Sequence, residues 1–183
     1  ARGPSDVLLE IDGATVAYGE IVGLRDASLS LRQGEIVALV GANGSGKTSL
    51  LRAITGLSPI ASGSITFSGQ PAPARVRDRT AFAALVPQDP AIALYHETVA
   101  EEVAETLHAR GRGRGPESSV LAAWNIAELA SRNPRDISVG QQQRVAVGAM
   151  LAHEPPVWLL DEPTRGADGP ARAWLAERLR GHA

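Results

Sequence analysis

The sequence contains no cysteine, which excludes disulfide bridges, zinc sites built from cysteine and thiol nucleophiles. No apolar run approaches the roughly 20 residues that a membrane-spanning helix needs. The first residues also lack the apolar segment of a signal peptide. Lysine is nearly absent, because Lys47 is the only one among 18 basic residues. These absences predict a soluble, cytoplasmic protein that holds any metal through oxygen or imidazole ligands.

The composition is that of one globular domain. The chain has 183 residues, of which 44% are apolar and 21% charged, and its formal net charge is -2. A chain of this length can bury a sizeable core but is short for two independent domains. Because the charges nearly balance, no large cationic surface is implied, and no nucleic-acid partner is expected.

Short β-strands dominate the predicted structure of the first part of the chain. Short strands are predicted at 7–11 (VLLEI), 15–18 (TVAY) and 27–31 (ASLSL), with turn signals between them, which favours an antiparallel sheet. Residues 36–40 (IVALV) form an unbroken apolar run, which is typical of a strand buried on both faces. A short helix is predicted at 47–56, directly after a glycine-rich stretch.

The rest of the chain mixes strands with helices. Further strands are predicted at 64–68, 82–86 and 157–160. Helices are expected after the capping residue Thr98, from Glu117 to about Leu129, from Ser138 to about Ala152, and from Asp168-Gly169-Pro170 onward. Gln141, three residues after Ser138, completes a capping-box pattern.

The sequence therefore predicts a single α/β domain over residues 1–183. Its core and antiparallel β region are expected at 1–88 and 138–183. A helical subdomain is expected at 89–137.

A phosphate-binding motif lies between the predicted strand at 36–40 and the helix that follows it. The motif G-x-x-x-x-G-K-[ST] allows backbone N–H groups to surround phosphate oxygens at the positive end of a helix. Lys47 would neutralise the β and γ phosphates of ATP, and Thr48 would bind Mg²⁺ through its hydroxyl. A simple glycine turn would not explain why the only lysine lies here. The predicted nucleotide-binding residues of this stretch are Gly41, Ala42, Asn43, Gly44, Ser45, Gly46, Lys47, Thr48 and Ser49.

A pair of carboxylates follows the apolar run at 157–160. In phosphate-binding enzymes of this kind, the metal needs an oxygen ligand and the attacking water needs a base. Asp161 is the predicted Mg²⁺ ligand, and Glu162 is the predicted general base. The alternative is that Asp161 only caps the next turn.

Three further segments resemble those of the ABC ATPases. Residues 138–144 (SVGQQQR) closely resemble the LSGGQ signature of that family, and they precede the carboxylate strand as in its members. Gln88 matches the glutamine of the family's Q-loop, and Tyr18 matches the aromatic residue that stacks on adenine. Within the family, the stretches ALYHETVAEEV and DEPTRGAD look most like ATPases of energy-coupling factor and cobalt-type importers of vitamins and metal ions.

The resemblance covers essentially the whole chain and implies a fold and a set of roles. The fold is a P-loop NTPase core of the ABC type, with an antiparallel β side sheet and a helical insertion. The implied catalytic residues are Glu162, Lys47 and Gln88, and the implied metal ligands are Thr48, Gln88 and Asp161. The implied nucleotide-binding residues outside the P-loop are Tyr18, Ser138, Gly140 and Gln141.

The same resemblance implies partners and a place in the cell. Two such domains, identical or different, stack head to tail with ATP between them, and Asp168 would lie at their interface. A transmembrane subunit completes the transporter. The protein would therefore lie on the inner face of the cell membrane, held there by that partner.

The chain departs from the family pattern in two places. Val139 replaces a glycine of the signature, and a branched side chain there could keep phosphate away from the helix. The family's switch histidine is not found, since His182 is too near the carboxylates and His153 has the character of a surface residue. The C-terminal part of the family domain is therefore expected to be absent, and the chain is expected to be either truncated or a domain that hydrolyses ATP poorly. The first residues (ARGPSD) also resemble a linker, as in one half of a tandem ATPase.

Three functions remain open from the sequence. The first is the ATP-hydrolysing subunit of a membrane transporter. The second is a non-transport ABC ATPase of the DNA-repair or chromosome type, although those usually carry a long coiled coil, and no sustained heptads occur between Gln88 and the signature. The third is an ATP-sensing dimerisation subunit with weak catalysis, which Val139 and the missing histidine favour.

Overall fold

The computed structural model describes residues 6–109, 117–165 and 169–182. Its contacts divide the chain into two compact units. The first unit consists of the described residues of Ala1–Leu85, Pro155–Leu159 and Glu177–Ala183, and the second of those of Val86–Glu154 and Leu160–Ala176. The predicted boundaries of a core and a helical subdomain stay a prediction.

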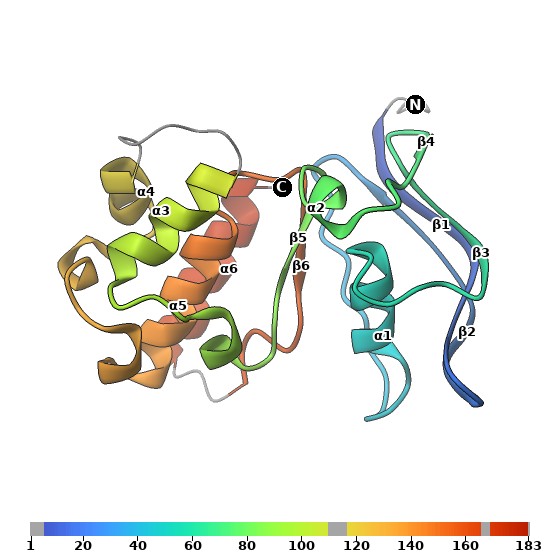
Figure 1. Cartoon of the computed structure of the whole chain (residues 1–183), viewed down its shortest axis with the longest axis horizontal. Helices are drawn as coiled ribbons and strands as arrows, with labels where there is room; N and C mark the ends of the chain where they lie inside the picture. The colour runs from blue at the N-terminus through green and yellow to red at the C-terminus, as the bar shows by residue number, and fades with distance from the viewer. Residues whose placement is uncertain (1–5, 110–116, 166–168, 183) are drawn as a thin grey trace. The chain divides into compact units, whose positions relative to one another are not determined.

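An antiparallel sheet is the main element of the first unit (Figure 1). Its strand order is β2-β1-β3-β4, with bounds Ile21–Arg32, Val7–Tyr18, Ser62–Phe67 and Gln70–Pro71. The two strands predicted at 7–11 and 15–18 are joined in β1. Gly13, at φ +57, lies within a register shift between Ile11 and Ala14, so the chain passes through this irregularity without leaving the sheet.

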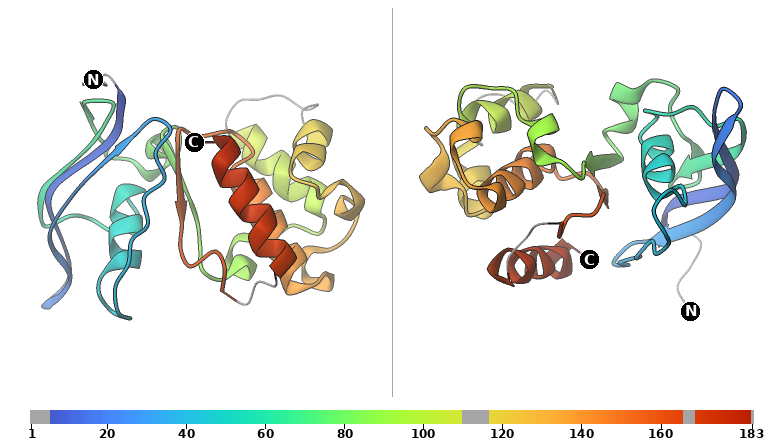
Figure 2. Two further views of the ribbon diagram at one scale, coloured as in Figure 1. Left: turned by 180° about the vertical axis from the view of Figure 1, so that it is seen from behind. Right: turned by 90° about the horizontal axis from the view of Figure 1, so that it is seen from below.

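Helix α1 (Lys47–Ile54) packs on this sheet, and the views of Figure 2 show it beside β1 and β2. Apolar residues of α1 and of the sheet share one buried cluster, which includes Leu50, Leu51, Ile54, Leu9, Ile11, Val16, Ile65 and Phe67. Each fully buried side chain of this size stabilises the fold by roughly 1.5–3 kcal/mol. This packing fixes α1, and with it the start of the helix next to the glycine-rich loop. A four-residue helix, α2 (Val76–Arg79), follows β4.

Two parallel strands, β5 (Ala83–Val86) and β6 (Val157–Leu160), form a second sheet. The N–H of Val157 donates to the carbonyl of Phe82, and the N–H of Asp161 donates to the carbonyl of Val86, each at 3.0 Å. Both bonds join residues with the same offset in sequence, so the strands run in the same direction. Their carboxyl ends therefore lie at one edge of this sheet.

The prediction of a buried strand at residues 36–40 is wrong. These residues lie outside both sheets, and Val40 is 93% exposed. An apolar run becomes a buried strand only where neighbouring strands accept its backbone hydrogen bonds and other layers cover its faces. In this structure the strands of the two sheets pair among themselves and leave residues 36–40 at the surface.

Helices make up most of the second unit (Figure 1). α3 (Val99–Ala109) packs against α4 (Glu117–Ala123) and α5 (Val139–Met150). α6 spans Gly169–His182, and its residues up to Ala176 belong to this unit. Short 3-10 turns lie at η2 (Pro90–Ala93), η3 (Ala127–Leu129) and η4 (Pro134–Asp136). None of the helices within the described ranges is both long and apolar enough to cross a bilayer.

The predicted starts of α1, α3 and α5 are confirmed, but the predicted end of the helix that contains Glu117 is wrong. The Thr98 hydroxyl accepts a hydrogen bond from the N–H of Glu101 at 3.2 Å, which caps α3. The helix expected from Glu117 to about Leu129 instead ends at Ala123. Asn125 has φ +52, and a residue in the left-handed conformation stops the helical hydrogen-bond ladder.

Candidate functional site

The glycine-rich loop before α1 uses backbone conformations that other residues rarely adopt. Gly44 has φ +80 and Gly46 has φ +92. A Cβ at Gly46 would lie 2.5 Å from the carbonyl oxygen of Gly23, and a Cβ at Gly41 would lie 2.6 Å from the Ser45 hydroxyl. The loop is therefore tightly curled and leads directly into α1. Such a loop presents backbone N–H groups and the positive end of the helix to an anion.

Lys47 is the first residue of α1, and its ammonium group turns back to the loop. Nζ donates hydrogen bonds to the carbonyl oxygens of Gly41 at 2.8 Å and Ala42 at 3.0 Å. The positive charge is thus held at the loop, where it would form strong charge-assisted hydrogen bonds with phosphate oxygens. Two further predicted residues are exposed to solvent: Asn43 on the loop and Thr48 in the first turn of α1.

Alanine at position 46 is expected to destabilise the loop far more than alanine at position 44. Both changes force a side chain into a positive φ, which costs roughly 1–2 kcal/mol. Only at Gly46 does the new Cβ also meet backbone, whereas nothing lies within 4 Å of a Cβ at Gly44. Overpacking adds about 1–3 kcal/mol. Denaturant unfolding of Gly46→Ala and Gly44→Ala measures this difference, and equal losses would contradict the geometry of the loop.

Tyr18 ends β1 and connects the sheet to α1. Its hydroxyl donates to Ser49 Oγ at 3.4 Å and shares a hydrogen bond with Ser58 Oγ at 3.0 Å. The hydrogen bonds with Ser49 and then Ser58 lower the pKa of the Tyr18 phenol. The ring lies against Gly23, where a Cβ would come within 2.7 Å of it, and the residue is 45% exposed. A planar base could therefore stack on the exposed ring.

Arg79 holds the opposite end of α1, which the sequence analysis missed. Its Nη1 donates to the carbonyl oxygens of Ala53 at 2.8 Å and Ile54 at 3.3 Å, and its Nε donates to that of Pro73. A cation at a helix C-terminus stabilises the last carbonyls and the helix dipole. Partial burial lowers the pKa of the Arg79 guanidinium. Arg79 thus helps to hold the helix that begins with Lys47.

In the second unit, Gln88 and Glu162 come together although 74 residues separate them. The Gln88 side-chain amide donates to the Glu162 carboxylate at 2.5 Å. Gln88 follows β5 by two residues, and Glu162 follows β6 by two residues, so their meeting results from the parallel pairing of these strands. Asp161, between β6 and Glu162, is buried, and its N–H bonds to Val86. The edge thus combines two carboxylates with an amide donor.

Glu162 has an unusual backbone conformation, with φ +44. For a residue other than glycine this conformation costs roughly 1–2 kcal/mol, and it persists only where the surroundings hold it. The N–H of Arg165 donates to the carbonyl of Glu162 at 3.0 Å, closing a turn after the carboxylates. Strain of this kind is common in residues that a site must hold in one orientation.

The first turn of α5 carries the signature residues. Ser138 caps the helix, because its hydroxyl accepts from the N–H of Gln141 at 3.3 Å while its own N–H donates to the Gln141 side chain at 2.9 Å. The predicted capping box is therefore confirmed. The side chain of Val139 is 61% exposed, and nothing lies within 4 Å of a Cβ at Gly140. This turn leaves Val139 as its bulkiest exposed group.

The loop chemistry fits the triphosphate of a nucleotide with a bound Mg²⁺. The loop offers an ammonium group at Lys47 and backbone conformations that only glycine adopts easily, and Thr48 adds a hydroxyl. Among the described residues, no group of three or more histidine or acidic side chains could hold a metal by itself. Mg²⁺ takes most of its ligands from phosphates and water and few from the protein, and the Thr48 hydroxyl is one oxygen that the loop offers.

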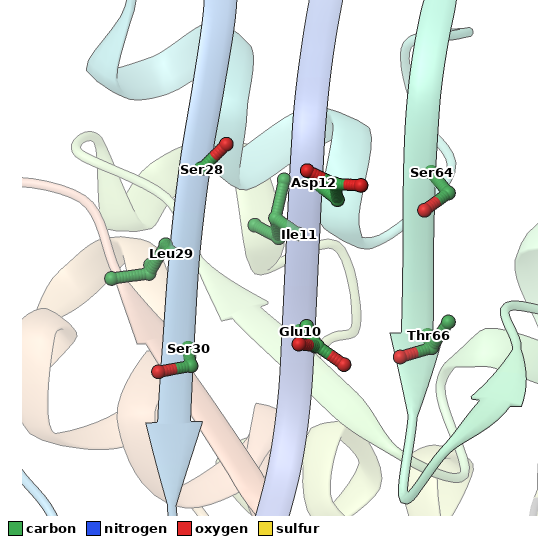
Figure 3. Close-up of a pocket in the computed structure, with 8 residues that line it drawn as sticks. All are labelled: Glu10, Ile11, Asp12, Ser28, Leu29, Ser30, Ser64 and Thr66. Atoms are coloured by element: carbon green, nitrogen blue, oxygen red, sulfur yellow. The ribbon is translucent and has the colours of Figure 1, made fainter.

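A shallow polar hollow lies elsewhere, on the strands β2, β1 and β3 (Figure 3). It is lined by Glu10, Ile11, Asp12, Ser28, Leu29, Ser30, Ser64 and Thr66. None of the predicted site residues belongs to this set. The hollow is the solvent-facing side of the antiparallel sheet, where polar residues alternate with core residues such as Ile11, which is 2% exposed.

Comparison with known families gives a match over most of the chain. The family model described as ABC transporter matches residues 24–165, which include the loop, Gln88, the signature and both carboxylates. The chain belongs to the ABC transporter family. The resemblance to the ABC ATPases that the motifs indicated is therefore confirmed for this chain, which is called the ABC domain below. Its α/β fold with an antiparallel sheet and helices is also that of the family.

The curated relatives of this ABC domain are longer proteins. A putative ABC transporter ATP-binding protein of Streptomyces avermitilis is 37% identical over 171 residues, covering 93% of this chain and 30% of the relative. The sulfate/thiosulfate import ATP-binding protein CysA of Ralstonia nicotianae is 39% identical over 181 residues, covering 94% of this chain and 48% of the relative. The ABC domain thus spans about a third to a half of these relatives.

Solved structures of transporter subunits resemble the ABC domain closely. The ATP-binding subunit of an ABC transporter superposes with a TM-score of 0.82 at 27% identity, covering 96% of this chain and 74% of that one. cbiO1 from Clostridium perfringens, part of the ABC transporter complex cbiONQ, gives a TM-score of 0.81 at 26% identity, covering 97% and 75%. Both likenesses extend over nearly the whole chain.

The structure distributes the predicted site residues over both units. Tyr18 and the loop from Gly41 to Ser49 belong to the first unit, and the hydrogen bond between Tyr18 and Ser49 joins them there. Gln88, Asp161 and Glu162 belong to the second unit, as do the signature residues of α5. Asp168, predicted for a dimer interface, lies outside the described residues.

Proposed function

We propose that this chain binds MgATP and hydrolyses it as the ATP-binding part of an ABC transporter. The hydrogen bond between Gln88 and Glu162 carries this proposal. A carboxylate held by an amide at the carboxyl edge of parallel strands, next to Asp161, is suited to orient and deprotonate an attacking water. The glycine loop with Lys47 supports the same proposal from the first unit, as an independent phosphate-binding element.

Each side chain takes a role that its chemistry allows. Lys47 and the loop N–H groups stabilise the negative charge of the phosphates, and Tyr18 stacks on the base. Glu162 accepts the proton of the attacking water, and Gln88 keeps its carboxylate oriented. Mg²⁺, when bound, neutralises charge that builds up on the phosphate oxygens. Thr48, Gln88 and Asp161 are its proposed oxygen ligands.

The proposed assembly is a head-to-tail pair of ATPase domains attached to a transmembrane subunit. Ser138, Gly140 and Gln141 at the start of α5 would face the ATP of the partner domain, since a helix N-terminus binds phosphate. The likeness to cbiO1, a part of a transporter complex, supports a membrane partner. In such an assembly the chain would lie on the cytoplasmic face of the membrane.

The proposed solute is a vitamin or a metal ion. The stretches that resemble energy-coupling factor and cobalt-type importers support this, as does the likeness to cbiO1. The CysA relatives, named for sulfate and thiosulfate import, give a second candidate class of solute at 39% identity. Purifying the chain with its membrane partner and measuring transport of radiolabelled cobalt or sulfate would separate these candidates.

Calorimetric titration with ATP, with and without Mg²⁺, tests the proposed function directly. The folded chain is expected to bind ATP in a magnesium-dependent way and to release phosphate, faster when its membrane partner is present. Absence of magnesium-dependent ATP binding by the folded protein would overturn the proposal. Binding without phosphate release, with or without the partner, would instead support an ATP-sensing subunit.

Val139 gives a specific reason to keep the sensor as a second candidate. Its side chain is 61% exposed on the first turn of α5, where the family usually has glycine. If this side chain keeps phosphate from the helix end, Val139→Gly is expected to raise ATP turnover several-fold. The change should also destabilise α5 by up to about 1 kcal/mol. Turnover equal to that of the wild type would show that Val139 does not limit catalysis.

A further inference from the structure

Gln143 is a buried polar residue on α5, with 6% of its surface exposed. Its side-chain amide donates a hydrogen bond to the carbonyl oxygen of Pro163 at 2.8 Å. A buried amide is stable only with such a partner, because water no longer satisfies it. The bond joins α5, whose first turn carries the signature residues, to the residue directly after Glu162.

The turn that carries the carboxylates is held at three successive residues. The N–H of Asp161 is bound by Val86 of β5, and the carbonyl of Glu162 is bound by the N–H of Arg165. The third attachment is the Pro163 carbonyl, which Gln143 holds. Between the outer two attachments lies Glu162 at φ +44, a conformation that relaxes when its surroundings release it.

We propose that Gln143 is a positioning residue for the Glu162 carboxylate. By holding Pro163, it keeps Glu162 in the left-handed conformation in which its carboxylate meets the Gln88 amide. The inference rests on the proposed function, because it assigns Gln143 a part in the orientation of the catalytic base. It also connects α5, which Ser138 caps, with the carboxylates of the same chain.

The neighbouring residue Gln142 provides a matched control. Its side-chain amide also donates to a proline carbonyl, that of Pro134, at 2.9 Å. The two glutamines thus make the same kind of bond from the same helix, but only Gln143 reaches the carboxylate turn. Gln142 is less buried than Gln143, so the two variants can differ in stability. Only a positioning role predicts that a folded Gln143 variant loses catalysis while a folded Gln142 variant does not.

The experiment compares Gln143→Leu with Gln142→Leu by measuring kcat for ATP and the Kd of MgATP. A misplaced catalytic group lowers the rate by up to about a hundredfold. Gln143→Leu is therefore expected to lower kcat at least about tenfold while the Kd stays within about twofold of the wild type. Gln142→Leu is expected to change neither by more than about twofold. Equal kcat values for the two variants would overturn the inference.

A double-mutant cycle with Glu162→Gln separates positioning from general damage. If Gln143 acts through Glu162, Gln143→Leu lowers kcat in the wild type but hardly at all in the Glu162→Gln background. If Gln143→Leu lowers kcat by the same factor in both backgrounds, the inference is overturned. Thermal melts check that each variant folds. If Gln143→Leu does not fold, Gln143→Asn replaces it in every comparison, because asparagine keeps the amide on a side chain too short to reach Pro163.

The outcomes also distinguish this inference from the proposed function. A wild-type chain that neither binds MgATP nor releases phosphate would remove both. A wild-type chain that hydrolyses ATP, together with Gln143 variants that match Gln142→Leu, would remove only the positioning role.

Discussion

Glutamine in place of Glu162 is expected to lower ATP turnover by about a hundredfold or more, because a positioned general base contributes on the order of 10²- to 10⁴-fold to a rate. The substitution keeps an acceptor oxygen, so the hydrogen bond from Gln88 can persist and the local geometry should change little. The affinity for MgATP should therefore stay close to that of the wild type. Phosphate release and calorimetry measure the two effects separately.

Glu154 offers a control with the same chemistry. It also has a positive φ, +55, and is an exposed residue of the segment between α5 and β6. Glu154→Gln removes one negative charge from the same unit in a similar backbone conformation, and it is expected to leave turnover within about twofold of the wild type. If Glu162→Gln hydrolyses ATP as fast as the wild type, Glu162 is not the base.

The elements that local chemistry specifies could be predicted from the sequence. The start of α1 follows from glycines that curl the backbone, and the start of α5 follows from the hydroxyl of Ser138 and the amide of Gln141. These features depend on residues within four positions of each other. Short-range hydrogen bonds decide them, so a short window of sequence contains all the information that is needed.

The failures concern features that depend on distant partners. The run at 36–40 has the composition of a buried strand, yet its residues are exposed, because strand formation depends on pairing with segments that the run itself does not specify. The continuity of β1 was missed for a related reason. Its pairing with both β2 and β3 carries the strand through Gly13, which alone is a turn signal.

The site residues also differ in whether neighbouring residues or distant partners determine them. Asp161 and Glu162 could be recognised because they follow an apolar run, but their meeting with Gln88 required the parallel pairing of β5 and β6. Gln143 was missed, although a signal was present. It lies four residues before Val147, which is 1% exposed, so helical periodicity places it on the buried face. A glutamine at a buried helical position requires a partner, which here is Pro163.

Alanine in place of Lys47 is expected to weaken MgATP binding by about tenfold to a few hundredfold. A hydrogen bond that involves a charged group contributes roughly 1.5–3 kcal/mol, and Lys47 offers the only ammonium side chain in the protein. The two hydrogen bonds from Nζ to the carbonyls of Gly41 and Ala42 show that the loop already holds this group. Calorimetry gives the change in Kd directly.

The loss of Lys47 must be separated from a loss of charge and from unfolding. Arg75→Ala removes one positive charge from an exposed position of the first unit, before α2, and is expected to leave the Kd of MgATP within about twofold. The unfolding midpoint of Lys47→Ala should stay near that of the wild type, because the packing of α1 depends on Leu50, Leu51 and Ile54 and not on the ammonium group. A Kd unchanged by Lys47→Ala would mean that the glycine loop does not bind the nucleotide, and the proposed function would lose its phosphate-binding element.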